Sequence, residues 1–314
     1  MKVQTLSLVI GTQACNAKCA FCVSHITGFG ELPKTRVFHR DIDKAVDLAL
    51  RGGATTALLT GKGEPTLYPA QISDALFHLK KFPLIELQTN GLTFGCFLTP
   101  QREGSRPVGA LVRDLLPDWR RAGLTTIALS TSGYLPTWHP KHRDLVEKNE
   151  FHYGRCLDYE SLVTHLRRLG FTIRFCIMAQ KGGIDTVEKL EDQLAWCKSV
   201  GVEQVIIRPI TTTRESHSKE AEYVRKQSVE DMFDDRNPHS FIRWANVVMT
   251  PILYLHDGGV VYSSQELGNL AIGNCLTNSI DKDSVRSLIF YPNGRLTYSW
   301  HEPGAVLLSG DMNE

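Results

Sequence analysis

Three cysteines lie within eight positions near the start of the chain, at Cys15, Cys19 and Cys22. Thiolates this close together can converge on one soft metal centre, and such thiolates hold iron–sulfur clusters. Three ligands would leave one iron of a four-iron cluster open to a substrate or cofactor. The alternative is a zinc site with His25 as fourth ligand, because Cys-x2-His is within zinc-like spacing. From these residues alone, both metals stay open.

The other five cysteines are scattered singly, at positions 96, 156, 176, 197 and 275. Isolated cysteines are more often small buried apolar residues than metal ligands. The pattern also differs from the disulfide framework of a small secreted protein. The sequence therefore predicts one metal centre, held by the early cysteines.

Apolar runs alternate with amphipathic stretches along the first two thirds of the chain. The expected strands are residues 6–10, 55–60, 85–89, 126–130, 172–178 and 203–208. The expected helices are residues 41–51, 70–80, 111–122, 159–169 and 187–200, several of them followed by a glycine suited to a helix end. Because each helix returns the chain to the same end of the sheet, the strands pair in parallel. The predicted fold class is α/β, either an open barrel or a doubly wound layer.

The remaining segments depart from this alternation. Residues 93–107 and 138–153 are expected to be long loops on the C-terminal side of the sheet, where functional groups usually gather. Residues 211–238 are charged and poor in large apolar side chains, which predicts a mobile loop or lid. Residues 253–263 and 288–300 carry hairpin signals, the second with an Asn-Gly turn.

The composition excludes some classes of protein. Lys plus Arg total 35 against 34 for Asp plus Glu, so the formal charge of +1 gives no field that would favour a nucleic acid. No apolar run approaches the roughly 20 residues that cross a bilayer, and no basic-then-apolar leader opens the sequence. We expect a cytoplasmic protein with no membrane partner.

Residues 15–22, Cys-Asn-Ala-Lys-Cys-Ala-Phe-Cys, resemble the signature of the radical S-adenosylmethionine (radical SAM) superfamily. Residues 60–65, Thr-Gly-Lys-Gly-Glu-Pro, resemble the Gly-Gly-Glu-Pro motif of that family, with Lys62 between the glycines as a departure. Residues 88–91 and 129–132 also look like strand ends of that family. The resemblance covers about residues 6–210.

The resemblance implies a partial (β/α)6 barrel with one [4Fe–4S] cluster on the three cysteines and S-adenosylmethionine at the open iron. Reductive cleavage of that cofactor would give methionine and a 5′-deoxyadenosyl radical, which removes a hydrogen atom from the substrate. The implied cofactor contacts are Gly61, which allows close backbone approach, Gly63 and Glu64 at the amino group, Ser130 and Ser132 at the ribose or carboxylate, Phe21 and Ile207 at the adenine, and Arg174 at the carboxylate.

Two further residues near the motifs are open to interpretation. Lys62 is most simply a solvated turn residue, with contact to substrate or cofactor as the alternative. His25, just after the last cysteine, either bonds the loop backbone or approaches the active cavity.

The chain divides at about residue 210 in this interpretation. Residues 1–210 form the radical SAM core, and residues 211–314 form a mobile segment and a hairpin extension that caps the barrel. The expected substrate is a small molecule or nucleotide, or a peptide, and the expected electron donor is a flavodoxin or ferredoxin. The alternatives are an RNA-modifying radical SAM enzyme and, in a different class, a non-catalytic zinc-binding module.

Overall fold

The computed structural model of the chain describes residues 2–28, 32, 41–95, 108–131, 158–254, 260–272, 284–300 and 305–309. The predicted loop at 138–153 and most of the one at 93–107 lie outside these residues. Ser132 and the turn of the first predicted hairpin also lie outside them.

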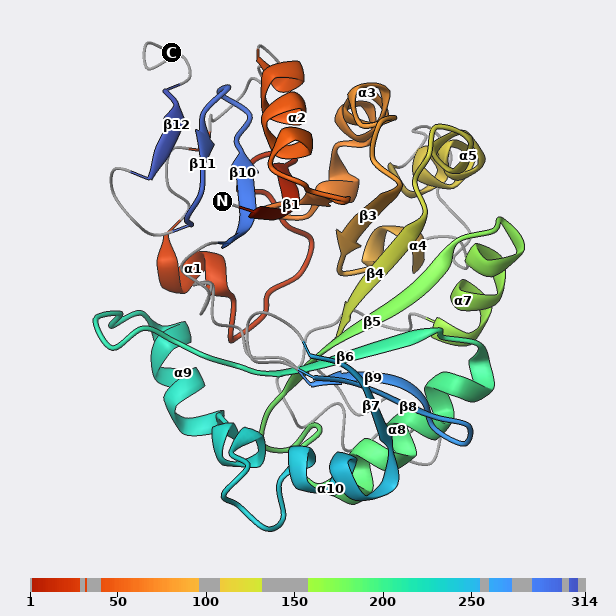
Figure 1. Cartoon of the computed structure of the whole chain (residues 1–314), viewed down its shortest axis with the longest axis vertical. Coiled ribbons are helices and arrows are strands. Elements are labelled where there is room, and N and C mark those ends of the chain that lie inside the picture. Colours follow the sequence, from red (N-terminus) through yellow and green to blue (C-terminus); the bar gives the residue numbers. More distant parts are fainter. Residues whose placement is uncertain are drawn as a thin grey trace, which may run out of the picture.

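Six parallel strands follow one another in the sheet in chain order. They are β1 (Lys2–Val9), β2 (Thr56–Thr60), β3 (Leu84–Thr89), β4 (Thr126–Thr131), β5 (Thr172–Ala179) and β6 (Gln204–Pro209). Figure 1 shows that the sheet curves without closing into a ring. The predicted α/β fold with a partial barrel of six parallel strands is confirmed.

Helices cover the outer side of this curved sheet (Figure 1). Those between the core strands are α2 (Ile42–Arg51), α3 (Pro69–His78), the short α4 (Leu92–Gly95), α5 (Val108–Arg121), α7 (Tyr159–Arg168) and α8 (Val187–Val200). Gly201 ends α8 with φ of 90°, a left-handed conformation that glycine adopts at little cost, as the sequence predicts. The helices bury their apolar stripes against the strands and form one continuous core.

The two faces of the core strands differ in side-chain burial. On β5 and β6 the odd-numbered residues are buried on the helix side, whereas the even-numbered residues within each strand face inward and are partly exposed, apart from exposed Thr172 at the start of β5. A parallel sheet covered on both faces has nearly continuous apolar strands. The alternation in this chain therefore indicates an inner face that is accessible and partly polar.

The C-terminal strands extend both edges of the core sheet. They are β7 (Thr250–Tyr254), β8 (Val260–Ser264), β9 (Gly268–Ile272), β10 (Ser284–Phe290), β11 (Leu296–Thr297) and β12 (Val306–Leu308). β9 pairs in parallel with β6, and β10 pairs in parallel with β1. The antiparallel pairs β7–β8 and β10–β11 confirm the two predicted hairpins, the second with Gly294 at φ of 81°.

Residues 211–238 contain helical structure where the sequence predicts a loop. Helix α9 (Lys219–Gln227) begins at Ser218, whose hydroxyl accepts from the Ala221 N–H, and a 3₁₀ turn, η4 (Glu230–Phe233), follows it. The prediction of a loop was wrong because a narrow apolar stripe on α9 is enough to pack this helix against the rest of the protein. Ala221 and Val224 are buried against Ile26, on α1 (Val23–Thr27).

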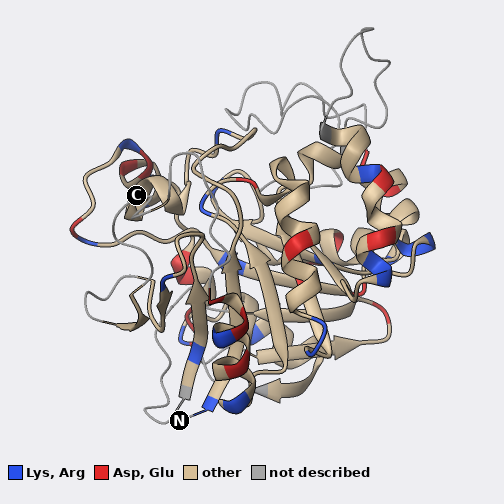
Figure 2. Cartoon of the chain, turned by 90° about the horizontal axis from the view of Figure 1, so that it is seen from above, with Lys and Arg blue, Asp and Glu red and all other residues tan. Residues whose placement is uncertain are grey.

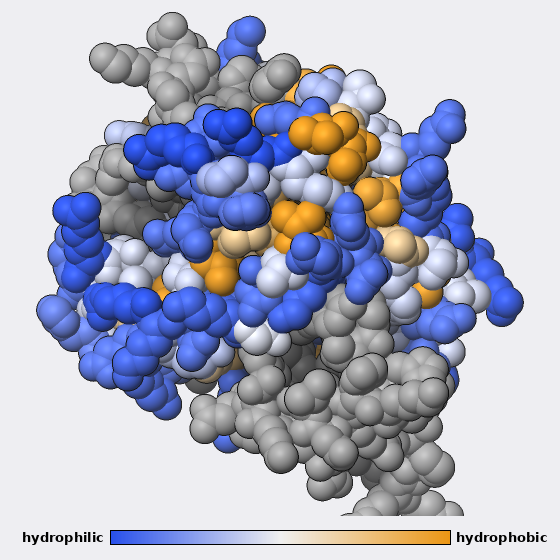
Figure 3. Space-filling view, turned by 90° about the horizontal axis from the view of Figure 1, so that it is seen from below, coloured by the Kyte–Doolittle hydropathy of each residue, from blue (hydrophilic) through white to orange (hydrophobic). Residues whose placement is uncertain are grey.

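Two views of the molecule show how charged and apolar residues are distributed on it. In the view of Figure 2, acidic and basic residues are interspersed along the helices, in line with the balanced composition. Figure 3 views the end where helix α10 (Phe241–Val248) lies and shows apolar side chains among polar ones. Two largely exposed apolar residues at this end are Val247 on α10 and Ile252 on the edge strand β7. Within the described ranges, no helix has the length and apolar character to cross a membrane.

Candidate functional site

The three cysteines lie on the loop that connects β1 to α1, at the C-terminal end of the core strands. Cys22 is the N-cap residue of α1, and its backbone N–H donates to the carbonyl of Cys19 at 3.1 Å. Cys19 and Cys22 are partly buried and Cys15 is exposed, and none of the three is in a disulfide. The loop thus presents three thiols from one short segment.

The glycine-rich turn after β2 supports this loop by close backbone contact. A Cβ on Gly63 would stand 2.2 Å from the Ala14 carbonyl oxygen and 2.7 Å from that of Thr12, so only glycine fits there without a shift. The next N–H, of Glu64, donates to the same Ala14 oxygen at 2.9 Å. The two motifs, about 40 residues apart in sequence, therefore hold each other in place.

The Glu64 carboxylate is buried and accepts four hydrogen bonds from the protein. Its Oε1 accepts from the Thr66 N–H (3.0 Å), the Thr66 hydroxyl (2.6 Å) and the Thr89 hydroxyl (2.6 Å), and its Oε2 accepts from the Asn90 N–H (2.9 Å). These bonds join the ends of β2 and β3. The position of Glu64 is thus that of a structural carboxylate, and its predicted contact with a cofactor amine is not part of this geometry.

Asn90 and Asn16 are site residues that the sequence prediction missed. The Asn90 side-chain amide donates to the Cys15 sulfur at 3.7 Å and to the Asn16 side-chain oxygen at 2.8 Å. Asn16 in turn donates to the hydroxyl of Thr93 at 3.3 Å. The signal in the sequence was the motif at residues 88–91, in which Gln88 and Thr89 end β3 and Asn90 follows it directly.

The electrostatic surroundings of Cys15 suit a metal-bound thiolate. Cys15 is exposed as a residue, but the protein around its sulfur removes part of the water, and this desolvation raises the pKa of the thiol. Negative charge at Glu64 and Cys22 raises the pKa further, while hydrogen bonds from the Ala17 N–H and Asn90 act in the opposite direction. A cationic centre bound to the sulfur would offset these unfavourable contributions. Sulfur hydrogen bonds of this kind are also usual around iron–sulfur clusters. The three thiols therefore fit the donor set of such a cluster.

The zinc alternative requires the three cysteines and His25 around one ion. Throughout the part of the chain that the structure describes, no three His, Cys, Asp or Glu side chains are gathered for a single metal ion, and this includes the three cysteines, so the finding does not separate zinc from a cluster. His25 lies on α1 and is exposed.

Phe21 joins the cysteine loop to the end of the sheet. It packs, together with Met178 at the end of β5, against the apolar cluster that α1 and α9 share. The hydroxyl of Ser216 also donates to the Ile26 carbonyl at 3.0 Å. The predicted contact of Phe21 with the adenine stays a prediction.

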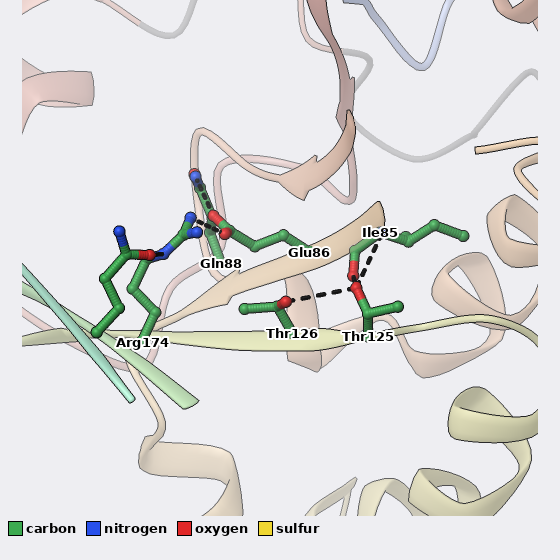
Figure 4. A network of polar contacts seen from close by, with 7 residues as sticks. Ile85, Glu86, Gln88, Thr125, Thr126 and Arg174 are labelled. Carbon is green, nitrogen blue, oxygen red and sulfur yellow. Dashed lines mark hydrogen bonds and ion pairs between the residues drawn. The ribbon is translucent and has the colours of Figure 1, made fainter. Parts of the chain in front are cut away.

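The inner face carries a polar network halfway along the strands (Figure 4). Arg174 on β5 pairs with the buried carboxylate of Glu86 on β3, and its Nε donates to the Gln204 side chain at 2.7 Å. Gln88 donates to the other oxygen of Glu86 at 3.0 Å. Burial of the carboxylate is compensated by these partners. The network gives the interior of the barrel both donors and acceptors.

The placement of three predicted cofactor residues can be compared along the strands. Ser130 faces inward near the C-terminal end of β4, beside Cys176, and its predicted contact with the ribose or carboxylate stays a prediction. Arg174 aligns with Ala128, which lies two residues before Ser130 and therefore further from the C-terminal end of the sheet. Its guanidinium is already paired with Glu86. Ile207 is fully buried on the helix side, so its predicted contact with adenine does not fit; the inward residue next to it is Ile206.

Lys62 is a partly buried residue and not the solvated turn residue that was expected. Its Nζ donates to the Gly28 carbonyl at 2.9 Å and lies 3.5 Å from the Thr27 hydroxyl. It also stands 5.8 Å from the ring centroid of Trp300. The side chain therefore spans from the glycine-rich turn to the end of α1.

Comparisons with known proteins establish the fold. No protein-family model matches the chain, and no curated protein matches it. SuiB from Streptococcus suis superposes with a TM-score of 0.51 at 12% sequence identity, covering 95% of this chain and 60% of SuiB. The structure of SuiB bound to S-adenosylmethionine gives a TM-score of 0.50 with the same identity and coverage. Methylornithine synthase (PylB) gives 0.44 at 15% identity, covering 68% of this chain and 56% of that one.

The likeness to SuiB shows a shared α/β fold over nearly the whole of the present chain. The chain spans about 60% of the length of SuiB.

Proposed function

We propose that the chain is a radical SAM enzyme with one [4Fe–4S] cluster bound by Cys15, Cys19 and Cys22. The observation that carries this proposal is the meeting of separate motifs at one end of the sheet. The cysteine loop contacts the glycine-rich turn through Ala14, and the strand-end amide of Asn90 contacts the Cys15 sulfur. A chance match in any one motif would not require these contacts.

S-adenosylmethionine is the cofactor that we infer for this site. SuiB, which shares the fold, is known in a structure bound to that molecule. When bound, the cluster and S-adenosylmethionine together supply reductive cleavage of the sulfonium and a carbon radical that abstracts hydrogen. We assign to Gly61 and Gly63 the backbone edge that lies along the cofactor, to Ser130 a hydrogen bond to it, and to Phe21 an apolar contact.

The protein's own contribution is to hold the loop rigid and to shape the cavity. Glu64 fixes the ends of β2 and β3 by four hydrogen bonds, and Asn90 directs a donor at one thiolate. We assign to Glu64 this positioning role in place of a direct contact with the amine. A preorganised site of this kind loses little energy to rearrangement during the reaction.

The substrate that the inner face favours is a polar small molecule, a nucleotide or a peptide. Gln88, Arg174 and Gln204 offer hydrogen-bonding groups halfway along the strands, and the Arg174 guanidinium retains N–H donors beyond those in its ion pair. We further propose residues 1–210 as the catalytic core and residues 211–314 as the part that completes the cavity. A flavodoxin or ferredoxin is the inferred electron donor.

Anaerobic reconstitution with iron and sulfide tests the cluster. We expect about four irons and four sulfides per chain. Cys19→Ala should abolish cluster binding, whereas Cys197→Ala, on the buried side of α8, should retain it. Binding of zinc without sulfide, or a full cluster in Cys19→Ala, would contradict the proposal.

A further inference from the structure

Lys62 occupies a position from which it can influence the cluster loop. It stands between Gly61 and Gly63, and the close fit of Gly63 against the Ala14 carbonyl fixes the backbone on its C-terminal side. The lysine side chain extends from this fixed turn to Thr27, the last residue of α1, and to Gly28, the residue after it. The contact between Gly63 and the Ala14 carbonyl, which supports the cysteine loop, therefore also fixes the backbone from which the Lys62 side chain extends.

Helix α1 connects the end reached by Lys62 to a predicted cluster ligand. The helix has only five residues and begins at Cys22, whose carbonyl accepts from the Ile26 N–H at 3.1 Å. A helix this short is marginal without outside contacts. Two such contacts hold its C-terminal carbonyls: the Ser216 hydroxyl at Ile26 and the Lys62 ammonium at Gly28.

The Lys62 ammonium lies at the C-terminal end of the five-residue helix that begins at Cys22, within one short helix of a predicted cluster ligand. Burial lowers the pKa of the lysine, and a negative charge at Cys22 acts in the opposite direction. Across the described segments, no carboxylate forms an ion pair with Lys62. The cation is thus not neutralised by a carboxylate of this part of the protein, and part of its field acts on the cysteine loop.

We propose that Lys62 is a positioning residue that anchors α1 behind Cys22 and holds a positive charge beside the cluster, which raises the reduction potential of the cluster. This inference rests on the proposed radical SAM function. A reduced cluster carries one more negative charge than an oxidised one, so a nearby cation stabilises the reduced form. Lys62 thereby makes the cluster easier to reduce.

The test is a redox titration of the reconstituted protein followed by electron paramagnetic resonance. Lys62→Met keeps the length of the side chain and removes its charge. We expect the ratio of reduced to oxidised cluster at a fixed potential to fall about tenfold, equivalent to about 59 mV for one electron. Lys62→Arg restores the charge and should return the potential toward that of the unmodified protein.

Lys181→Met is the matched control. The Lys181 ammonium also donates to a backbone carbonyl, that of Lys226 at 3.1 Å, but it is exposed and lies on the segment between β5 and α8. Its loss should leave the potential unchanged. An unchanged potential in Lys62→Met with a full complement of iron and sulfide would overturn the inference.

A second measurement uses the protein without its cluster. Hydrogen exchange of the peptide that contains residues 23–28 should be faster in Lys62→Met than in Lys181→Met, because α1 loses one of its two anchors. Equal exchange in the two variants would overturn the anchoring role. If the unmodified protein takes up no iron and sulfide, the proposed function itself fails, whatever the exchange experiment shows.

Discussion

Glu64→Gln is expected to destabilise the protein without its cluster by about 3 kcal/mol. The carboxylate accepts three donors at Oε1 and one at Oε2, all from Thr66, Thr89 and Asn90. A glutamine has one oxygen and one NH₂ group. Whichever way the amide is turned, its NH₂ group faces a backbone N–H, of Asn90 or of Thr66, which cannot accept a hydrogen bond and has lost its acceptor.

The magnitude follows from the bonds that are lost. With the amide oxygen in the place of Oε1, the buried Asn90 N–H loses a bond to a charged acceptor, worth about 1.5–3 kcal/mol. The three remaining bonds become neutral and weaker. Relief of the buried charge offsets part of this cost, which leaves about 3 kcal/mol.

Urea unfolding of the apoprotein under reducing conditions measures this effect as a lower midpoint at unchanged slope. Glu222→Gln is the control, because Glu222 is exposed on α9 and its substitution should change stability by less than about 0.5 kcal/mol. Equal midpoints for Glu64→Gln and Glu222→Gln would refute the argument that the carboxylate organises the two strand ends.

Three further predictions concern other parts of the structure. Gly63→Ala should bind less iron and unfold at lower urea than Gly61→Ala, because the added Cβ would stand 2.2 Å from a backbone oxygen at position 63 and 3.0 Å at position 61; the reverse order would contradict the close fit. Asn90→Ala should lower the midpoint potential of the cluster, since it removes an N–H donor to the Cys15 sulfur, and an unchanged potential in electron paramagnetic resonance titration would argue against that bond. Burial raises the pKa of Cys197 and that of Tyr159 to about 12 each, so their contribution to stability is complete below pH 9 and is lost as the pH rises toward 12. Between pH 8 and pH 10.5, Cys197 accounts for a loss of at most about 2 kcal/mol in the free energy of unfolding, measured in urea. An equal loss in a Cys197→Ala variant over the same pH range would contradict this.

The sequence was sufficient for the core of the fold because its signals there are local. The period of apolar residues identified the six strands, and glycines such as Gly201 marked the helix ends. The Asn-Gly pair before Arg295 identified the second hairpin. The pairing of β9 with β6 and of β10 with β1 could not be predicted, because it depends on contacts between segments far apart in the chain.

For the candidate site, spacing located the loop but not the contacts around it. The sequence identified Glu64 from its motif, but its four hydrogen-bond donors belong to Thr66, which follows β2, and to Thr89 and Asn90, at the end of β3. Ile207 was misplaced by one residue, and that error reverses the face of a strand. Lys62 was taken as solvated because nothing nearby in sequence indicates that Gly28 and Trp300 lie within its reach.

Release of 5′-deoxyadenosine tests the proposed chemistry most directly. The reconstituted protein is incubated anaerobically with S-adenosylmethionine and a strong reductant, and products are measured by mass spectrometry. We predict 5′-deoxyadenosine and methionine in equal amounts, and none from Cys22→Ala. Protein with a full complement of iron and sulfide that releases no 5′-deoxyadenosine above the Cys22→Ala background would contradict the account.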